Sequence, residues 1–177
     1  MDSQTQSSID MLETALKMEE KGQAFYGEAL KVCQTPQGLE IFSALIEDEK
    51  VHMCRIRQIY ASLNASADWP REWEKLPPHK GLESLLKDLA TKTKKELNKD
   101  VSDLTAIGIA LEFEQASILF YEEHRSKTTH PTEAAFLDQM VLEEKGHWRA
   151  LKDTRYYLTD PEGWFMEKER AGLDGAE

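Results

Sequence analysis

The sequence reads Glu49-Lys50-Val51-His52 in its first half and Glu144-Lys145-Gly146-His147 in its second, 95 residues later. A spacing of three residues places the glutamate and the histidine of each pair on one face of a helix. Each pair is preceded, 30 residues earlier, by another glutamate, Glu19 or Glu114. The chain therefore carries one arrangement of two carboxylates and one imidazole twice.

Aromatic residues repeat with the same offset, since Phe25-Tyr26 recurs as Phe120-Tyr121. Tyr26 and Tyr121 follow Glu19 and Glu114 by two helical turns, which returns them to the same helix face. Two interpretations stay open for these tyrosines. They are core aromatics, or their hydroxyls hydrogen-bond a carboxylate that binds metal and orient it.

Apolar residues follow the helical spacing of three and four residues in four long segments, and the repeated acids and histidines lie on these stripes. Such stripes face a shared core in helix bundles. The pattern predicts an all-α antiparallel four-helix bundle built from a duplicated helical hairpin. Glu47 and Glu143 lie off the stripes, so we expect their substitution by alanine to disturb metal binding far less than that of Glu49 or Glu144.

The breaks between the helices support two hairpins. Gln34-Thr35-Pro36 lies midway between Glu19 and Glu49, and Thr129-His130-Pro131 occupies the equivalent place in the second half. Proline suits the first turn of a following helix. We expect one domain over residues 1–177, with hairpins at about 7–63 and 102–158. A long crossover, 64–101, with a helical stripe from Gly81 to about Asn98, joins them, and a tail, 159–177, packs back on the bundle.

Four carboxylates on apolar stripes present an electrostatic problem. An ionised carboxylate that leaves water is very costly unless it is paired or bound to a metal. A salt-bridged polar layer would need basic side chains on the stripes, and none lies there. Two divalent cations would neutralise four carboxylates, and bundles hold two-metal sites with this recipe. The predicted metal ligands are Glu19, Glu49, His52, Glu114, Glu144 and His147.

Composition excludes several other classes of function. The formal net charge is −11, from 22 basic and 33 acidic residues, with no basic run that would bind nucleic acid or an anionic membrane. Cys33 and Cys54 form no C-x-x-C pair. The sequence shows neither a signal-peptide layout nor an apolar run of membrane-spanning length. We therefore expect a soluble cytoplasmic protein.

Two stretches, Ala15 to Tyr26 and Ala110 to Tyr121, make the chain resemble the rubrerythrin branch of the ferritin-like di-iron carboxylate proteins. The resemblance implies a ferritin-like bundle in which the six predicted ligands hold two iron ions, with Glu49 and Glu144 as bridging carboxylates. Two features depart from the family pattern. The chain lacks the rubredoxin-like domain with its four cysteine ligands, and Ser117 stands where the family has an additional glutamate.

The expected function is redox chemistry at this centre. Two Fe ions are the expected cofactors, with Mn or Zn as other divalent metals that suit the site. The protein is expected to reduce hydrogen peroxide or dioxygen, as a homodimer, with electrons from an external donor protein. The alternative is iron binding or storage, a ferroxidase role without a dedicated small-molecule substrate.

Overall fold

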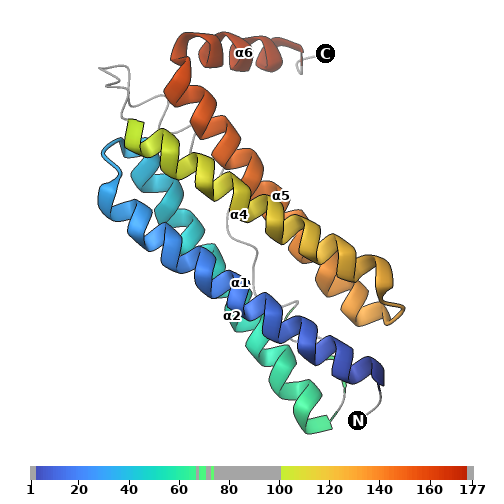
Figure 1. The fold of residues 1–177 in the computed structure, drawn as a ribbon. Helices are drawn as coiled ribbons and strands as arrows, with labels where there is room; N and C mark the ends of the chain where they lie inside the picture. Colours follow the sequence, from blue (N-terminus) through green and yellow to red (C-terminus); the bar gives the residue numbers. More distant parts are fainter. Residues whose placement is uncertain (1–2, 67, 71–72, 74–100, 175–177) are drawn as a thin grey trace.

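The structure is a computed structural model, and it describes residues 3–66, 68–70, 73 and 101–174. The helices are α1 (Ser3–Val32), α2 (Pro36–Ser66), α4 (Val101–Lys127), α5 (Pro131–Thr159) and α6 (Pro161–Asp174). The described residues contain no strand. Helices α1 and α2 form one antiparallel hairpin and α4 and α5 form the other, with their loops at opposite ends of the bundle (Figure 1). The predicted all-α bundle of two hairpins is confirmed.

The helix starts follow local capping chemistry. Pro36 and Pro131 occupy first-turn positions, where the missing backbone N–H costs nothing. The Thr35 hydroxyl caps α2 by accepting a hydrogen bond from the Gly38 N–H at 3.0 Å. The His130 side chain caps α5 in the same way.

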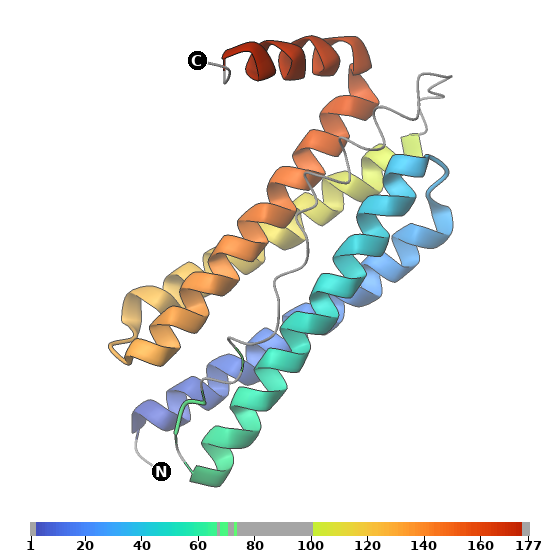
Figure 2. The same cartoon turned by 180° about the vertical axis from the view of Figure 1, so that it is seen from behind.

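The apolar stripes pack into two clusters, one toward each end of the bundle. The first contains the fully buried Phe42, Leu45 and Ile107, and the second contains Leu12 and Ile56 with their neighbours. The two hairpins lie face to face along this interior, as the reverse view shows (Figure 2). Because the repeated acids and histidines occupy the middle of each helix, they are enclosed between two apolar clusters.

Polar contacts at both ends fix one hairpin to the other. Asp103, at the start of α4, accepts hydrogen bonds of 3.0 Å from the backbone N–H groups of Gln34 and Thr35 in the α1–α2 loop. At the opposite end, the Ser8 hydroxyl of α1 donates to Glu133 of α5 at 3.0 Å. These contacts set how far each hairpin slides along the other.

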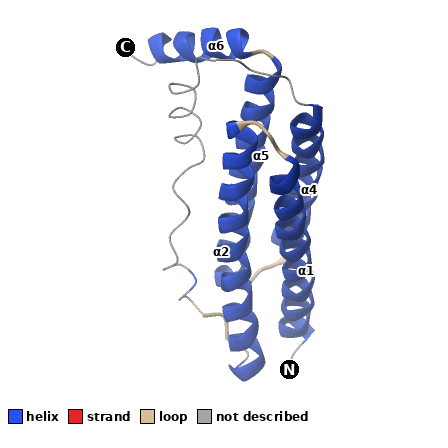
Figure 3. Ribbon diagram, turned by 90° about the vertical axis from the view of Figure 1, so that its left-hand side faces the viewer, coloured by secondary structure: helices blue, strands red, loops and turns tan. Residues whose placement is uncertain are grey.

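The tail packs back on the bundle as predicted, but it does so as a helix. Helix α6 lies across the end of the bundle (Figure 3). Its Trp164 is buried, donates from Nε1 to Asp153 at 3.0 Å and makes an edge contact with Tyr157. Asp160 starts the helix by accepting from the Gly163 N–H at 3.0 Å. The stripe predicted between Gly81 and Asn98 lies outside the described residues.

Contrary to the expectation from the sequence, one described segment, Asp103–Lys127, is long and apolar enough to cross a membrane by length and composition alone. It forms most of α4, which packs against both α5 and α1. It also carries the buried acid Glu114. These features are those of a core helix in a bundle.

Candidate metal centre

All six predicted ligands converge at the middle of the bundle and are buried. Helices α1 and α4 contribute one glutamate each, and α2 and α5 contribute one Glu-x-x-His pair each. None of the six exposes more than 4% of its surface: Glu19, Glu49, His52, Glu114, Glu144 and His147.

The donor atoms fall into two overlapping groups. One contains Glu19, Glu49 and His52, and the other contains Glu49 with the three ligands of α4 and α5. Within each group the donor atoms all lie within 4.8 Å of one another. Glu49 belongs to both. The oxygens of Glu144 lie 3.1 Å from Nδ1 of His52 and 3.5 Å from Nδ1 of His147. Glu49 and Glu144 thus lie between the two donor groups, and these are the two residues to which the resemblance gives the role of bridging carboxylates.

The donor set fits a pair of cations. Among the buried side-chain atoms without a hydrogen-bond partner in the described part of the chain, four belong to candidate ligands: Oε2 of Glu49, Oε2 of Glu114, Oε1 of Glu144 and Nδ1 of His147. Buried polar atoms without hydrogen bonds are costly. Both imidazoles direct Nδ1 toward the carboxylates. Metal ions between these groups would satisfy the atoms that the protein leaves unpaired.

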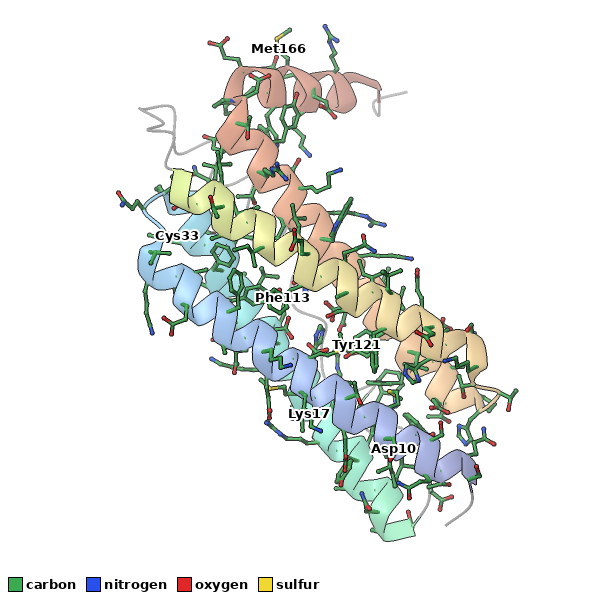
Figure 4. All side chains as sticks on the ribbon, viewed as in Figure 1. Asp10, Lys17, Cys33, Phe113, Tyr121 and Met166 are labelled. Atoms are coloured by element: carbon green, nitrogen blue, oxygen red, sulfur yellow. The ribbon has the colours of Figure 1, made fainter. Side chains whose placement is uncertain are left out.

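The two tyrosines cross between the hairpins. The Tyr26 hydroxyl of α1 donates to Glu114 of α4 at 2.5 Å, and the Tyr121 hydroxyl of α4 donates to Glu19 of α1. Figure 4 shows Tyr121 between these two helices. Burial and the charges of nearby glutamates raise the pKa of both tyrosines well above the usual value. Each hydroxyl therefore keeps its proton and orients a glutamate of the opposite hairpin.

Asp48 and Glu143 contact the Nε2 atoms of the two histidine rings, on the side of each ring away from the other carboxylates. Nε2 of His52 lies 2.9 Å from Glu143, and Nε2 of His147 lies 3.2 Å from Asp48. A carboxylate at Nε2 fixes the proton on that nitrogen and leaves Nδ1 available to bind metal. The sequence contains a signal for this pair, because an acid precedes the glutamate of both Glu-x-x-His motifs.

Helical periodicity along the sequence missed the contact of Glu143 with the centre. Its carboxylate accepts from His52, from the Arg55 guanidinium and from the Gln139 amide at 2.7 Å. Although burial acts in the opposite direction, these hydrogen bonds lower the pKa of Glu143 to about 2. The contact was missed because α5 packs against α2 as well as α4. A position off the main stripe therefore still faces a neighbouring helix. Glu47, by contrast, is exposed and pairs with Lys50.

No basic side chain was expected on the apolar stripes, yet Arg55 lies close to the acids of the centre. It sits one residue before Ile56 of the apolar stripe, yet it is only 2% exposed. Its guanidinium pairs with Glu143 and so reaches the centre through His52. The equivalent position in the second hairpin is Ala150. The first hairpin therefore supplies a buried arginine to the centre, and the equivalent position of the second hairpin does not.

Burial dominates the protonation of two carboxyls. It raises the pKa of Glu49 well above the usual range, and the charge of Glu19 adds to this effect. Burial, opposed in part by the charge of His147, raises the pKa of Glu114 to about 8. In the absence of metal, the Glu114 carboxyl therefore holds its proton at neutral pH, and the pKa of Glu49 is shifted in the same direction.

The histidines respond to the same surroundings in the opposite sense. Burial disfavours a charged imidazole, but the charge of Glu144 raises the pKa of His52 well above the usual value. Glu114 has the same effect on His147. Burial also opposes the charge of Glu144, but His52 and His147 hold its pKa well below the usual range. The carboxylates thus favour the protonated form of both imidazoles, and burial opposes it.

Comparison with known proteins agrees with this geometry. The rubrerythrin family profile matches residues 10–154, a span that contains all six candidate ligands and both tyrosines. No curated protein and no solved structure matches the chain. The helical bundle is the ferritin-like fold of that family, and the buried carboxylate–histidine cluster fits a di-metal site. The chain therefore belongs to the rubrerythrin family.

Proposed function

We propose that this protein is a non-haem di-iron oxidoreductase that reduces hydrogen peroxide or dioxygen with electrons from an external donor. One observation carries the proposal. Six buried ligands meet in two overlapping groups, with oxygen and nitrogen atoms left unpaired between them. Carboxylate oxygens favour hard ferric ions, and imidazole suits iron in both oxidation states.

The protein's own residues prepare the site for this chemistry. Two ferrous ions would supply the two electrons that convert one peroxide to water. Tyr26 and Tyr121 hold the terminal glutamates in place, and Glu143 and Asp48 hold the imidazoles. The apolar clusters on both sides exclude bulk water along the bundle axis. The centre is thus organised before any oxidant arrives.

An external donor and a partner subunit belong to the same proposal. The sequence has two cysteines, fewer than a four-thiolate iron site requires. Electrons for repeated turnover therefore come from another protein. We also propose that the chain works as a homodimer, which light scattering on a sizing column would test directly.

The decisive experiment follows oxidation of the ferrous protein. Protein loaded anaerobically with iron is mixed with hydrogen peroxide or with dioxygen in a stopped-flow instrument. We expect one oxidation event per centre, followed by arrest until a reductant is added. Continued peroxide consumption without reductant would overturn the proposal in favour of a catalase-like reaction.

The same experiment addresses the alternative role in iron binding and storage. Ser117, which replaces an expected glutamate, is the residue that favours this alternative. A storage protein would oxidise successive additions of ferrous iron and retain far more than two ferric ions per chain. A fixed content of about two ions per chain instead supports the redox proposal.

A further inference from the structure

A cavity of about 220 Å³ opens at the crossing of α1 and α4, beside the candidate metal centre. Glu19 and Glu49 contribute to its lining, as do Met18 and Phe113. Figure 4 shows Phe113 between α1 and α4. We call this cavity the Gly22 pocket, after one of the residues that line it.

The two hairpins line this pocket with equivalent positions of the repeat. Gly22 on α1 corresponds to Ser117 on α4, and Met18 corresponds to Phe113. Small residues therefore meet where the helices cross, and larger apolar residues form the walls. Phe113 also stacks on Phe25 with a ring distance of 5.3 Å, which holds that wall in place.

Gly22 keeps one ligand uncovered. A Cβ atom at this position would lie 3.7 Å from Oε1 of Glu49 and 3.8 Å from the Tyr26 ring. These are ordinary contact distances, so alanine would fit. Alanine would also favour the helix by about 1 kcal/mol over glycine. Helix stability therefore does not explain why residue 22 is a glycine. Access to the Glu49 carboxylate does explain it.

The size of the pocket exceeds what hydrogen peroxide needs. A water molecule occupies about 30 Å³ in the liquid, and hydrogen peroxide, with one oxygen atom more, is only slightly larger. A pocket of about 220 Å³ leaves most of its volume to another group. That group would contact Met18 and Phe113, which favour an apolar substituent.

We propose that the Gly22 pocket admits organic hydroperoxides with a small alkyl group as substrates. The alkyl group packs on Met18 and Phe113, and the peroxide end faces Glu19 and Glu49. The inference rests on the proposed redox function. The reaction would break the O–O bond; two ferrous ions held by the six candidate ligands would supply one electron each, and two protons would come from solvent. The products are one alcohol and one water.

A binding experiment tests the pocket without redox chemistry. Protein loaded with zinc and labelled at the methionine methyl groups is titrated with tert-butanol, the alcohol that tert-butyl hydroperoxide would leave. We expect the Met18 methyl resonance to shift and the Met166 methyl, on the exposed face of α6, to stay in place. Gly22→Val should abolish the Met18 shift, and Gly27→Val should retain it. Gly27 is the matched control, because it lies on the same helix and a Cβ there meets nothing within 4 Å.

A kinetic experiment then compares two oxidants on the ferrous protein. We expect Gly22→Val to lower the rate ratio of tert-butyl hydroperoxide to hydrogen peroxide at least tenfold relative to Gly27→Val. Gly22→Ala should give a smaller decrease while raising the melting temperature, which separates access from folding.

The outcomes separate the two proposals. A Met18 shift without any reaction with peroxide upholds the pocket as a binding site and overturns the redox function. Oxidation by hydrogen peroxide with no Met18 shift, or with equal rate ratios in the two valine variants, overturns the pocket and leaves the redox function in place.

Discussion

The hairpin of α1 and α2 and the hairpin of α4 and α5 supply the same ligands but support them differently. His52, from the first hairpin, is held by Glu143, which is itself held by the buried Arg55. His147, from the second, is held by the shorter Asp48. Ala150 stands where symmetry would place a second arginine. The two hairpins therefore carry the same candidate ligands, but the residues that hold the two histidines are not fully duplicated.

The carboxylates between the two donor groups also differ. Burial and the charge of Glu19 raise the pKa of Glu49, whereas the charges of the two histidines lower that of Glu144. Protonation is thus favoured at Glu49 and disfavoured at Glu144. This difference teaches that two sites with identical ligands need not bind metal equally.

The largest effect on metal binding is expected from substitution of Glu49 or Glu144, the acids that lie between the two donor groups. Glu49→Ala and Glu144→Ala should each reduce metal content from about two ions per chain to less than one, because each acid lies between both donor groups. Metal analysis after iron reconstitution measures this. Glu47→Ala is the matched control, since Glu47 is exposed and two residues from Glu49. Equal iron content in all three variants would contradict the shared position.

Removal of the buried arginine should destabilise the fold. Arg55→Met deprives Glu143 of a buried ion pair, which we expect to cost about 3 kcal/mol of unfolding free energy. Urea denaturation of the metal-free protein measures the change. Arg57→Met is the control, because Arg57 pairs with Glu20 on the surface, where a pair contributes at most about 1 kcal/mol. Similar losses in both variants would show that Arg55 has no special role.

Substitution of the histidine supports should separate the two metal positions. Glu143→Gln should weaken the metal near His52, and Asp48→Asn the metal near His147, each by about 10- to 100-fold. We expect the larger effect for Glu143, because its substitution also removes the charged partner of Arg55. Competition with a chelator measures the two affinities. The comparison fails if either variant weakens both metals equally.

An effect of about tenfold per pH unit for each proton that metal displaces is expected from acidification between pH 8 and pH 7. The raised pKa values of Glu49 and Glu114 mean that metal must displace protons from these carboxyls. Falling pH therefore favours the metal-free protein. Glu144, with its lowered pKa, contributes no proton in this range. Calorimetry in buffers of different ionisation enthalpy measures the protons released, and an affinity independent of pH would refute this assignment.

The sequence by itself determined the helices and which residues meet at the centre. The reason is that helical periodicity is local. A spacing of three residues fixes Glu49 and His52 on one face, and the exact repeat of that spacing fixes Glu144 and His147 at the same depth. The burial of all four residues agrees with this derivation.

Only the tertiary structure decided which partners meet across helices. Periodicity along one helix does not say which neighbour a side chain faces, so it missed the contact of Glu143 with His52. It also left open whether Tyr26 bonds a carboxylate, which proves to be Glu114 of the other hairpin. The pocket at Gly22 exists because α1 crosses α4 at that residue. Contacts of this kind depend on the distance and rotation between helices, which packing of the whole core sets.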